Sequence, residues 1–150
     1  MSKKHPVIAI TGSSGAGTST VKGAFHHIFS RLKVEPIIIE GDSFHRHDRE
    51  EMKRVMAKEE AQGNKYFSHF GPEANHFDEI EKTFKAYGEK GLCRRRYYLH
   101  NEEEAGPFGQ NPGEFTPWEE VGKGSDLLFY EGLHGGVEYG DIDVSKYVDL

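Results

Sequence analysis

The chain has 150 residues, the size of one ordinary domain, and its 19 Lys and Arg against 25 Asp and Glu give a net charge of −6. This acidic balance argues against a general nucleic-acid binder, and no apolar run approaches the ~20 residues of a membrane-spanning helix. The single cysteine, Cys93, excludes an internal disulfide and predicts a reducing, cytoplasmic setting, and the first residues leave no room for a signal peptide.

The first half of the chain predicts two buried strands and two helices. Residues 7–11 and 35–42 contain short β-branched apolar runs, each followed by glycine, which is typical of buried parallel strands. Between them, a Gly-rich loop leads into a helix whose predicted apolar face consists of Val21, Ala24, Phe25, Ile28, Phe29 and Leu32. A charged helix is predicted over residues 48–62, ended by glycine at position 63.

The second half predicts one more helix, two strands and a long loop. We expect a helix to open at Pro72, to bury the stripe Phe77, Ile80, Phe84 and Tyr87, and to end at Gly88. Residues 94–100 indicate a short edge strand, and residues 101–123, acidic and then rich in Pro and Gly, indicate a loop or lid. Residues 126–131 predict a third buried strand, and residues 147–150 look like the beginning of another. Alternating strands and helices predict an α/β fold with a mainly parallel sheet flanked by helices.

The Gly-rich loop has the spacing of a phosphate-binding P-loop, G-x-x-x-x-G-K-S/T, except that Thr18 stands where the lysine belongs. Its glycines let backbone N–H groups face a phosphate, and the following helix N-terminus adds positive potential. The alternative is an ordinary Gly/Ser turn between a strand and a helix. Because Thr18 carries no charge, the phosphate interpretation requires another cation. The predicted ATP-binding residues are Gly12, Ser13, Ser14, Gly15, Ala16, Gly17, Thr18, Ser19 and Thr20.

Two acids are expected where ligands bind in an α/β fold, at the carboxyl ends of strands. Asp42 follows the second strand and suits a catalytic base for an alcohol acceptor, although it could instead cap the next helix. Glu131 ends the third strand in the pattern of a Walker B acid, with a solvated strand-end acid as the alternative. Ser19 and Glu131 are the candidate Mg²⁺ residues.

A basic cluster of His45, Arg46 and Arg49 lies beside Asp42 in the sequence. Such a cluster suits an anionic acceptor, although a solvated helix start would look the same. The run Arg94 to Arg96 is equally ambiguous. The nine histidines form no set with zinc-site spacing.

Together, four segments of the chain resemble bacterial phosphoribulokinases. These are residues 12–20 (GSSGAGTST), 40–46 (EGDSFHR), 67–75 (FSHFGPEAN) and 128–135 (LFYEGLHG), with two short blocks at 96–100 and 115–118 that agree. The resemblance runs in register from residue 2 to residue 150, and a lysine-free P-loop is itself typical of the bacterial branch. It implies a P-loop NTPase-like fold and ATP-dependent, Mg²⁺-dependent phosphorylation of the C1 hydroxyl of D-ribulose 5-phosphate, giving the ribulose 1,5-bisphosphate of the Calvin cycle.

The resemblance also implies roles for individual residues. Asp42 would be the catalytic base and Glu131 the acid that assists the metal, while residues 12–20 hold ATP. The sugar phosphate would be contacted by His45, Arg49, Tyr98 and His100. Arg31 matches a position linked to an allosteric response to NADH. Plant-type members carry a redox-sensitive P-loop cysteine, but Ala16 stands in the loop here, so no thiol switch is expected.

Bacterial members of the family are close to twice this length. Residues 1–150 are therefore expected to be the N-terminal part of a single P-loop kinase domain, whose missing residues supply further charged groups and which forms a homo-oligomer when complete. The fragment alone is expected to have little activity. Neither a nucleic acid nor a membrane is an expected partner. Two alternatives stay open: a uridine kinase-like nucleoside kinase, and a non-catalytic nucleotide-binding homologue.

Overall fold

Three parallel strands form the centre of the structure, a computed structural model that describes residues 4–13 and 15–150. Strand β5 (Leu127–Gly132) lies between β1 (Val7–Thr11) and β2 (Pro36–Glu40), giving the order β1-β5-β2. Its first four residues are buried, as a central strand with both faces covered requires. The three predicted strands and their parallel arrangement are confirmed, but burial is complete only along the start of β5: Val7 and Ile8 are the buried residues of β1, and Ile39 is the buried residue of β2.

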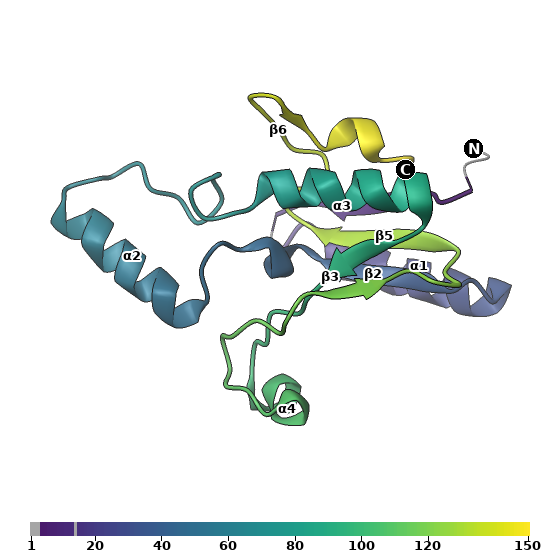
Figure 1. Cartoon of the computed structure of the whole chain (residues 1–150), viewed down its shortest axis with the longest axis horizontal. Coiled ribbons are helices and arrows are strands. Elements are labelled where there is room, and N and C mark those ends of the chain that lie inside the picture. The colour runs from purple at the N-terminus through teal and green to yellow at the C-terminus, as the bar shows by residue number, and fades with distance from the viewer. Residues whose placement is uncertain (1–3, 14) are drawn as a thin grey trace.

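One helix covers each face of this sheet. Helix α1 (Thr18–Leu32) packs Phe25 and Phe29 against Phe129 of β5, with ring centroids 5.4 Å apart in both pairs. Helix α3 (Phe77–Lys90) packs Phe84 against the ring of Tyr130 at 5.3 Å. Because successive strand side chains point to opposite faces, neighbouring residues of β5 anchor opposite layers, and Figure 1 shows α3 lying across the sheet.

The apolar face predicted for α1 is only partly buried. Phe29 is buried and Phe25 packs against the same cluster, whereas Ile28 and Leu32 are 46% and 68% exposed. The helix meets the sheet along the line of Phe25, His26 and Phe29, each of which contacts Phe129. Ile28 and Leu32 lie outside the apolar cluster that Phe29 and Phe129 form with the sheet, which leaves them exposed.

Helix α2 (Arg49–Ala61) lies apart from the sheet (Figure 1). Its N-terminus has a capping box, in which the side chain of Asp48 accepts from the backbone of Glu51 and the side chain of Glu51 accepts from the backbone of Asp48. None of its residues is buried. The helix predicted over residues 48–62 is confirmed.

The third helix differs at both ends from its prediction. It begins at Phe77, with His76 as N-cap, and not at Pro72. The backbone of residues 72–76 is used elsewhere: the carbonyl of Ala74 accepts from Arg46 and the N–H of His76 donates to Phe44. The helix also continues past Gly88 to Lys90, and Gly91 ends it with a left-handed φ of 69°.

Shorter elements surround the sheet. Strand β3 (Cys93–Arg95) pairs antiparallel with β4 (Glu119–Val121). The edge strand predicted over residues 94–100 is therefore present only at its beginning, because β3 ends at Arg95. The predicted loop or lid contains that β4 and two short helices. The remaining elements are η1 (Gly41–Phe44), α4 (Glu102–Ala105), η2 (Gly106–Phe108), β6 (Glu138–Tyr139), β7 (Ile142–Asp143) and η3 (Ser145–Tyr147).

The last residues run along the free edge of β1. The backbone of Asp149 donates to the carbonyl of Val7 and that of Ala9 donates to Leu150, both at 2.8 Å. These bonds continue the sheet beyond β1, although residues 148–150 are not assigned as a strand. None of the helices in the described part of the chain combines the length and apolarity that crossing a bilayer requires.

The ends of β2 and β5 approach too closely for side chains. A Cβ at Gly132 would lie 2.8 Å from the Cα of Gly41, and 2.5 Å from the hydroxyl of Tyr130. The reciprocal Cβ at Gly41 would lie 3.0 Å from the Cα of Gly132. Glycine is therefore required on both strands at this point, directly before Asp42 and directly after Glu131.

We expect Gly132→Ala to lower the free energy of unfolding by about 1–3 kcal/mol, because the new methyl group overpacks this contact. Gly136→Ala is the matched control, since a Cβ there meets nothing within 4 Å. Urea unfolding followed by circular dichroism measures both. Equal stability of the two variants would contradict the account of the strand ends.

Candidate active site

The Gly-rich loop leaves a helix N-terminus open to an anion. Gly15 and Gly17 have left-handed φ angles of 84° and 86°, which L side chains rarely adopt. Gly17 is also the N-cap of α1, where no side chain makes a cap hydrogen bond and no acid occupies the first turn. The N–H groups that begin a helix lack intrahelical partners and attract anions. Of the nine residues predicted to bind ATP, Ser14 lies outside the described residues.

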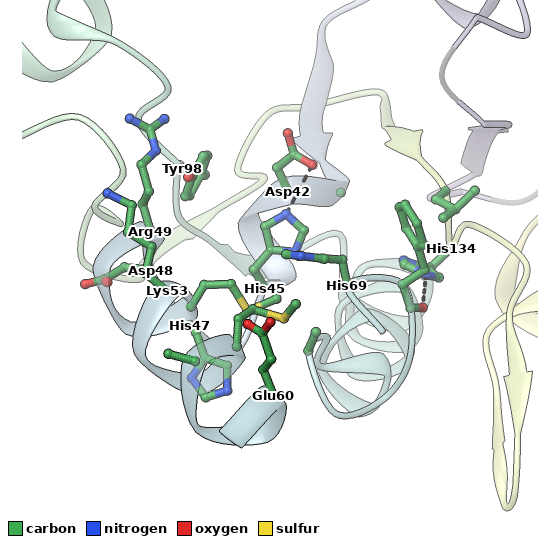
Figure 2. A pocket seen from close by; sticks show the side chains of 17 residues that line it. Asp42, His45, His47, Asp48, Arg49, Lys53, Glu60, His69, Tyr98 and His134 are labelled. Carbon is green, nitrogen blue, oxygen red and sulfur yellow. Dashed lines mark hydrogen bonds and ion pairs between the residues drawn. The ribbon is translucent and has the colours of Figure 1, made fainter. Parts of the chain in front are cut away.

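Asp42 stands at the centre of a cluster of polar side chains. It lies in η1, directly after β2, and its Oδ2 is 2.9 Å from Nε2 of His100. Its Oδ1 is 3.4 Å from Nε2 of His45 (Figure 2). These residues are 58 and 3 positions away in the sequence, so the fold brings the His100 segment to the strand end.

Each histidine is held from its other ring nitrogen. Nδ1 of His45 is 2.9 Å from Oδ1 of Asn75, a buried side chain whose amide donates to the carbonyls of residues 69 and 71. Nδ1 of His100 is 3.0 Å from Oε2 of Glu104, which also accepts from the backbone of His100 at 2.8 Å. Both rings are thereby aimed at Asp42.

Asn75 and Glu104 have no predicted role in the sequence, although both hold a histidine of the site. Asn75 ends one of the segments that resemble phosphoribulokinases, which was a usable signal. Glu104 lies four residues after His100, but that segment was expected to be a loop. The four-residue spacing alone could not show that α4 (Glu102–Ala105) follows His100 so closely and brings Glu104 to its ring.

The charges of the cluster reinforce one another. The contact with His45 lowers the pKa of Asp42 to about 2, with burial opposing the shift and the His100 contact adding to it. Burial alone would lower the pKa of both histidines, but the contacts with Asp42, and with Asn75 or Glu104, raise the pKa of each above its usual 6.5. An ionised Asp42 between two imidazoles that favour protonation gives the site an anion surrounded by positive charge.

Arg49 and Tyr98 complete the predicted group. Nη2 of Arg49 donates to the carbonyl of His100 at 2.9 Å. The ring of Tyr98 lies edge-on between His45 and His100, with centroids 5.9 and 4.9 Å away. The structure therefore brings together all four predicted substrate-binding residues with Asp42.

The neighbouring arginines turn away from this group. Arg46 donates to the carbonyl of Pro72 and approaches His76, so it leaves the predicted basic cluster. Arg96 donates to the carbonyls of Ser43 and His45 at 2.7 and 2.8 Å and lies over Phe115, 3.7 Å from the ring centroid. Arg96 therefore holds the backbone that carries His45.

The second strand-end acid is already paired. Oε2 of Glu131 is 2.9 Å from Nζ of Lys22, a residue of α1 to which sequence analysis gave no role. The same ammonium is 3.8 Å from Glu40 at the end of β2. Ser19, the other candidate metal residue, is exposed in the first turn of α1, and Arg31 is exposed in its last turn, away from the strand ends.

The residues present suit Mg²⁺ bound together with a nucleotide rather than Mg²⁺ alone. Among the described residues, no group of three or more His, Cys, Asp or Glu could hold a metal ion. Mg²⁺ commonly uses one or two protein oxygens together with phosphate oxygens and water. The hydroxyl of Ser19 and the carboxylate of Glu131 are donors of that kind.

A cavity of about 810 Å³ opens from Asp42 toward α2. Figure 2 shows Arg49 and Tyr98 on the same side of Asp42, with His134 across the opening. Charged groups are not confined to the neighbourhood of Asp42, because Glu60 near the end of α2 also lines the cavity (Figure 2). Polar residues of the lining include Asp42, His45, Arg49, Lys53 and Tyr98, and its apolar residues include Met52, Met56, Phe70 and Leu133.

Residues 7–150 match the family described as Phosphoribulokinase / Uridine kinase family. The whole chain is 56% identical to the plasmid phosphoribulokinase of Cupriavidus necator, of which it covers 51%, and 53% identical to the phosphoribulokinase of Nitrobacter vulgaris, of which it covers 52%. It superimposes on phosphoribulokinase from Rhodobacter spheroides with a TM-score of 0.87 at 46% identity, covering 99% of this chain and 50% of that one. The chain thus spans about half the length of the curated relatives it matches.

Removing the carboxylate of Asp42 should lower the pKa of both His45 and His100. We expect this in Asp42→Asn because burial continues to disfavour the imidazolium while its main partner loses its charge. NMR titration of the histidine resonances measures the change, and His76, whose pKa burial lowers, is the internal reference.

The same contacts should make stability depend on pH. Their contribution is lost as pH rises through the raised histidine pKa values, and again as pH falls from about 4 toward the lowered pKa of Asp42. The difference in unfolding free energy between the unaltered chain and Asp42→Asn should therefore be largest near pH ~5. Unchanged histidine titration in Asp42→Asn would show that the cluster does not form in solution.

Proposed function

Because this chain belongs to the phosphoribulokinase and uridine kinase family, we propose that it is the nucleotide-binding part of an ATP-dependent kinase that phosphorylates the C1 hydroxyl of ribulose 5-phosphate. The product is ribulose 1,5-bisphosphate, the acceptor of CO₂ in the Calvin cycle. The observation that carries the proposal is the group around Asp42: a carboxylate at a strand end, surrounded by two histidines, an arginine and a tyrosine. ATP and sugar phosphates are cytoplasmic metabolites, so the proposed reaction places the protein in the cytoplasm.

Each phosphate has a suitable place in the proposed complex. The N–H groups of residues 12–20 and the start of α1 receive the phosphates of ATP, with Gly15 and Gly17 supplying the left-handed turns. His45, Arg49, Tyr98 and His100 receive the phosphate and hydroxyls of the sugar. In kinases of this class Mg²⁺ neutralises the charge that develops on the transferred group, and Ser19 and Glu131 are the residues that would hold it.

Asp42 accepts the proton of the attacking hydroxyl in this proposal. A carboxylate with a pKa of about 2 is a weak base, and the contacts with His45 and His100 keep it so. A sugar phosphate competes with Asp42 for the same two imidazoles, because both are anions. Substrate binding would therefore draw the histidines away and restore the basicity of Asp42 when the hydroxyl arrives.

An uncharged nucleoside fits this site less well than a sugar phosphate. Uridine, the alternative acceptor within the family, gives no use to the positive charge that His45, His100 and Arg49 gather around Asp42. A non-catalytic homologue would have no need of a carboxylate aimed between two held histidines. A phosphoryl-transfer assay with both acceptors distinguishes the nucleoside kinase and the non-catalytic homologue from the proposed kinase.

The finer proposals concern regulation and assembly. We propose an effector site for NADH at Arg31, which the family resemblance supports and which its exposed place in the last turn of α1 allows. A helix rises about 1.5 Å per residue, so Arg31 lies roughly 20 Å from the Gly-rich loop. The exposed apolar side chains of Ile28 and Leu32 beside it support a homo-oligomer of the complete protein. The segment over residues 101–123, which carries Glu104, is proposed to act as a lid on the substrate.

A chimera tests the proposed reaction without depending on where this chain ends. Residues 1–150 replace the matching segment of the Cupriavidus necator enzyme, and transfer from γ-labelled ATP is measured with ribulose 5-phosphate and with uridine. We expect transfer to the sugar phosphate, and a loss of about 10²–10⁴-fold in kcat for Asp42→Asn with ATP binding retained.

The unaltered Cupriavidus enzyme is the control for the assay. Transfer to uridine in preference to the sugar phosphate would move the assignment to nucleoside kinases. A folded chimera without transfer, or one that Asp42→Asn does not slow, would support a non-catalytic role for this part of the protein.

A further inference from the structure

We propose that Lys22 is the cation that replaces the P-loop lysine and binds the β- and γ-phosphates of the nucleotide, an inference that rests on the proposed function. The loop has Thr18 at the lysine position, so its neutral hydroxyl leaves phosphate charge uncompensated. Lys22 is one helical turn further along the same helix.

The position of Lys22 on α1 directs it toward the strand ends. Phe25, His26 and Phe29 all contact Phe129 of β5, and Lys22 precedes them by three, four and seven residues. These intervals place Lys22 on the sheet-facing side of the helix. Long helical side chains lean toward the N-terminus of their helix, which here is the end that follows the Gly-rich loop.

The ammonium of Lys22 is found beside the two strand-end acids. Nζ is 2.9 Å from Oε2 of Glu131 and 3.8 Å from Oε1 of Glu40. Burial alone would lower the pKa of Lys22, but the hydrogen bond and charge of Glu131, with the charge of Glu40, raise it, so the side chain stays cationic. The charge thus lies at the end of β5, which is next to the end of β1 from which the Gly-rich loop leaves.

The arginines near Asp42 make their contacts away from the end of β5, and Arg49 among them is proposed to bind the sugar phosphate. Arg46 donates to the carbonyl of Pro72, Arg49 to that of His100, and Arg96 to those of Ser43 and His45. Within residues 4–13 and 15–150, no other lysine or arginine forms an ion pair with Glu40 or Glu131. Lys22 is therefore the cation best placed to meet a nucleotide phosphate.

The ammonium group of Lys22 can bind Glu131 before the nucleotide arrives and a phosphate afterwards. It carries three N–H donors, and Glu131 takes one of them. The β- and γ-phosphates together carry more negative charge than a single carboxylate, so nucleotide binding would draw Lys22 from Glu131 and free that carboxylate for the metal. The role is one of binding and charge neutralisation at the phosphates, with no proton transferred.

Calorimetric binding of ATP, ADP and AMP in the presence of Mg²⁺ tests this role, in the 150-residue chain and in the chimera. We expect Lys22→Met to weaken ATP and ADP binding by about tenfold or more, since a charged hydrogen bond is lost, and to leave AMP binding nearly unchanged. Lys22→Arg should retain most of the affinity. Adding Thr18→Lys to Lys22→Met should restore it, because the charge returns to the usual position.

Lys85→Met is the matched control, since Lys85 is exposed on α3, and thermal unfolding monitors the fold of every variant. If Lys22 only balances Glu40 and Glu131, Lys22→Met changes ATP and AMP affinity equally, or changes neither, and the inference is overturned while the proposed function stands. If the unaltered chain and chimera bind no ATP at all, the proposed function fails and the inference fails with it.

Discussion

The close approach of the chain at Gly41 and Gly132, at the ends of β2 and β5, determines where Asp42 and Glu131 lie. A side chain on either residue would collide with the opposite backbone and with the hydroxyl of Tyr130. With both side chains absent, Asp42 and Glu131 emerge from neighbouring strand ends beside the Gly-rich loop. The rest of the core supports this point: α3 packs on Tyr130 from one face and α1 packs on Phe129 from the other.

Opposite charges at the strand ends hold the site ready before any ligand arrives. Asp42 is paired with His45 and His100, and Glu131 with Lys22. In both pairs the cation is a group that an incoming phosphate can attract. Under the proposed function, the arrangement would link binding to activation: the sugar phosphate would release Asp42, and the nucleotide would release Glu131 to hold the metal. Each carboxylate would then lose its pairing cation only when its own ligand binds.

Local patterns predicted the elements well, whereas contacts made by distant segments could not be read from them. The runs before Asp42 and Glu131 are short and apolar, so their strand structure followed from composition, although the first of them is only partly buried. The predicted start of α3 was wrong. Pro72 is a good first helical residue, but hydrogen bonds from Arg46 to Ala74 and from His76 to Phe44 hold residues 74–76 in another conformation. The same limit hid Lys22, whose partner Glu131 lies on β5. Glu104 was missed for a local reason, because the segment that it shares with His100 was expected to be a loop.

The most direct measurement is an NMR titration of the His45 and His100 imidazoles with ribulose 5-phosphate, using uridine and unphosphorylated ribulose as comparison ligands. The account predicts that both resonances shift saturably with the sugar phosphate alone, and that Arg49→Met weakens the effect because a cation beside His100 is removed. Equal shifts with all three ligands, or no shift with the sugar phosphate, would contradict the claim that the group around Asp42 is a sugar-phosphate site.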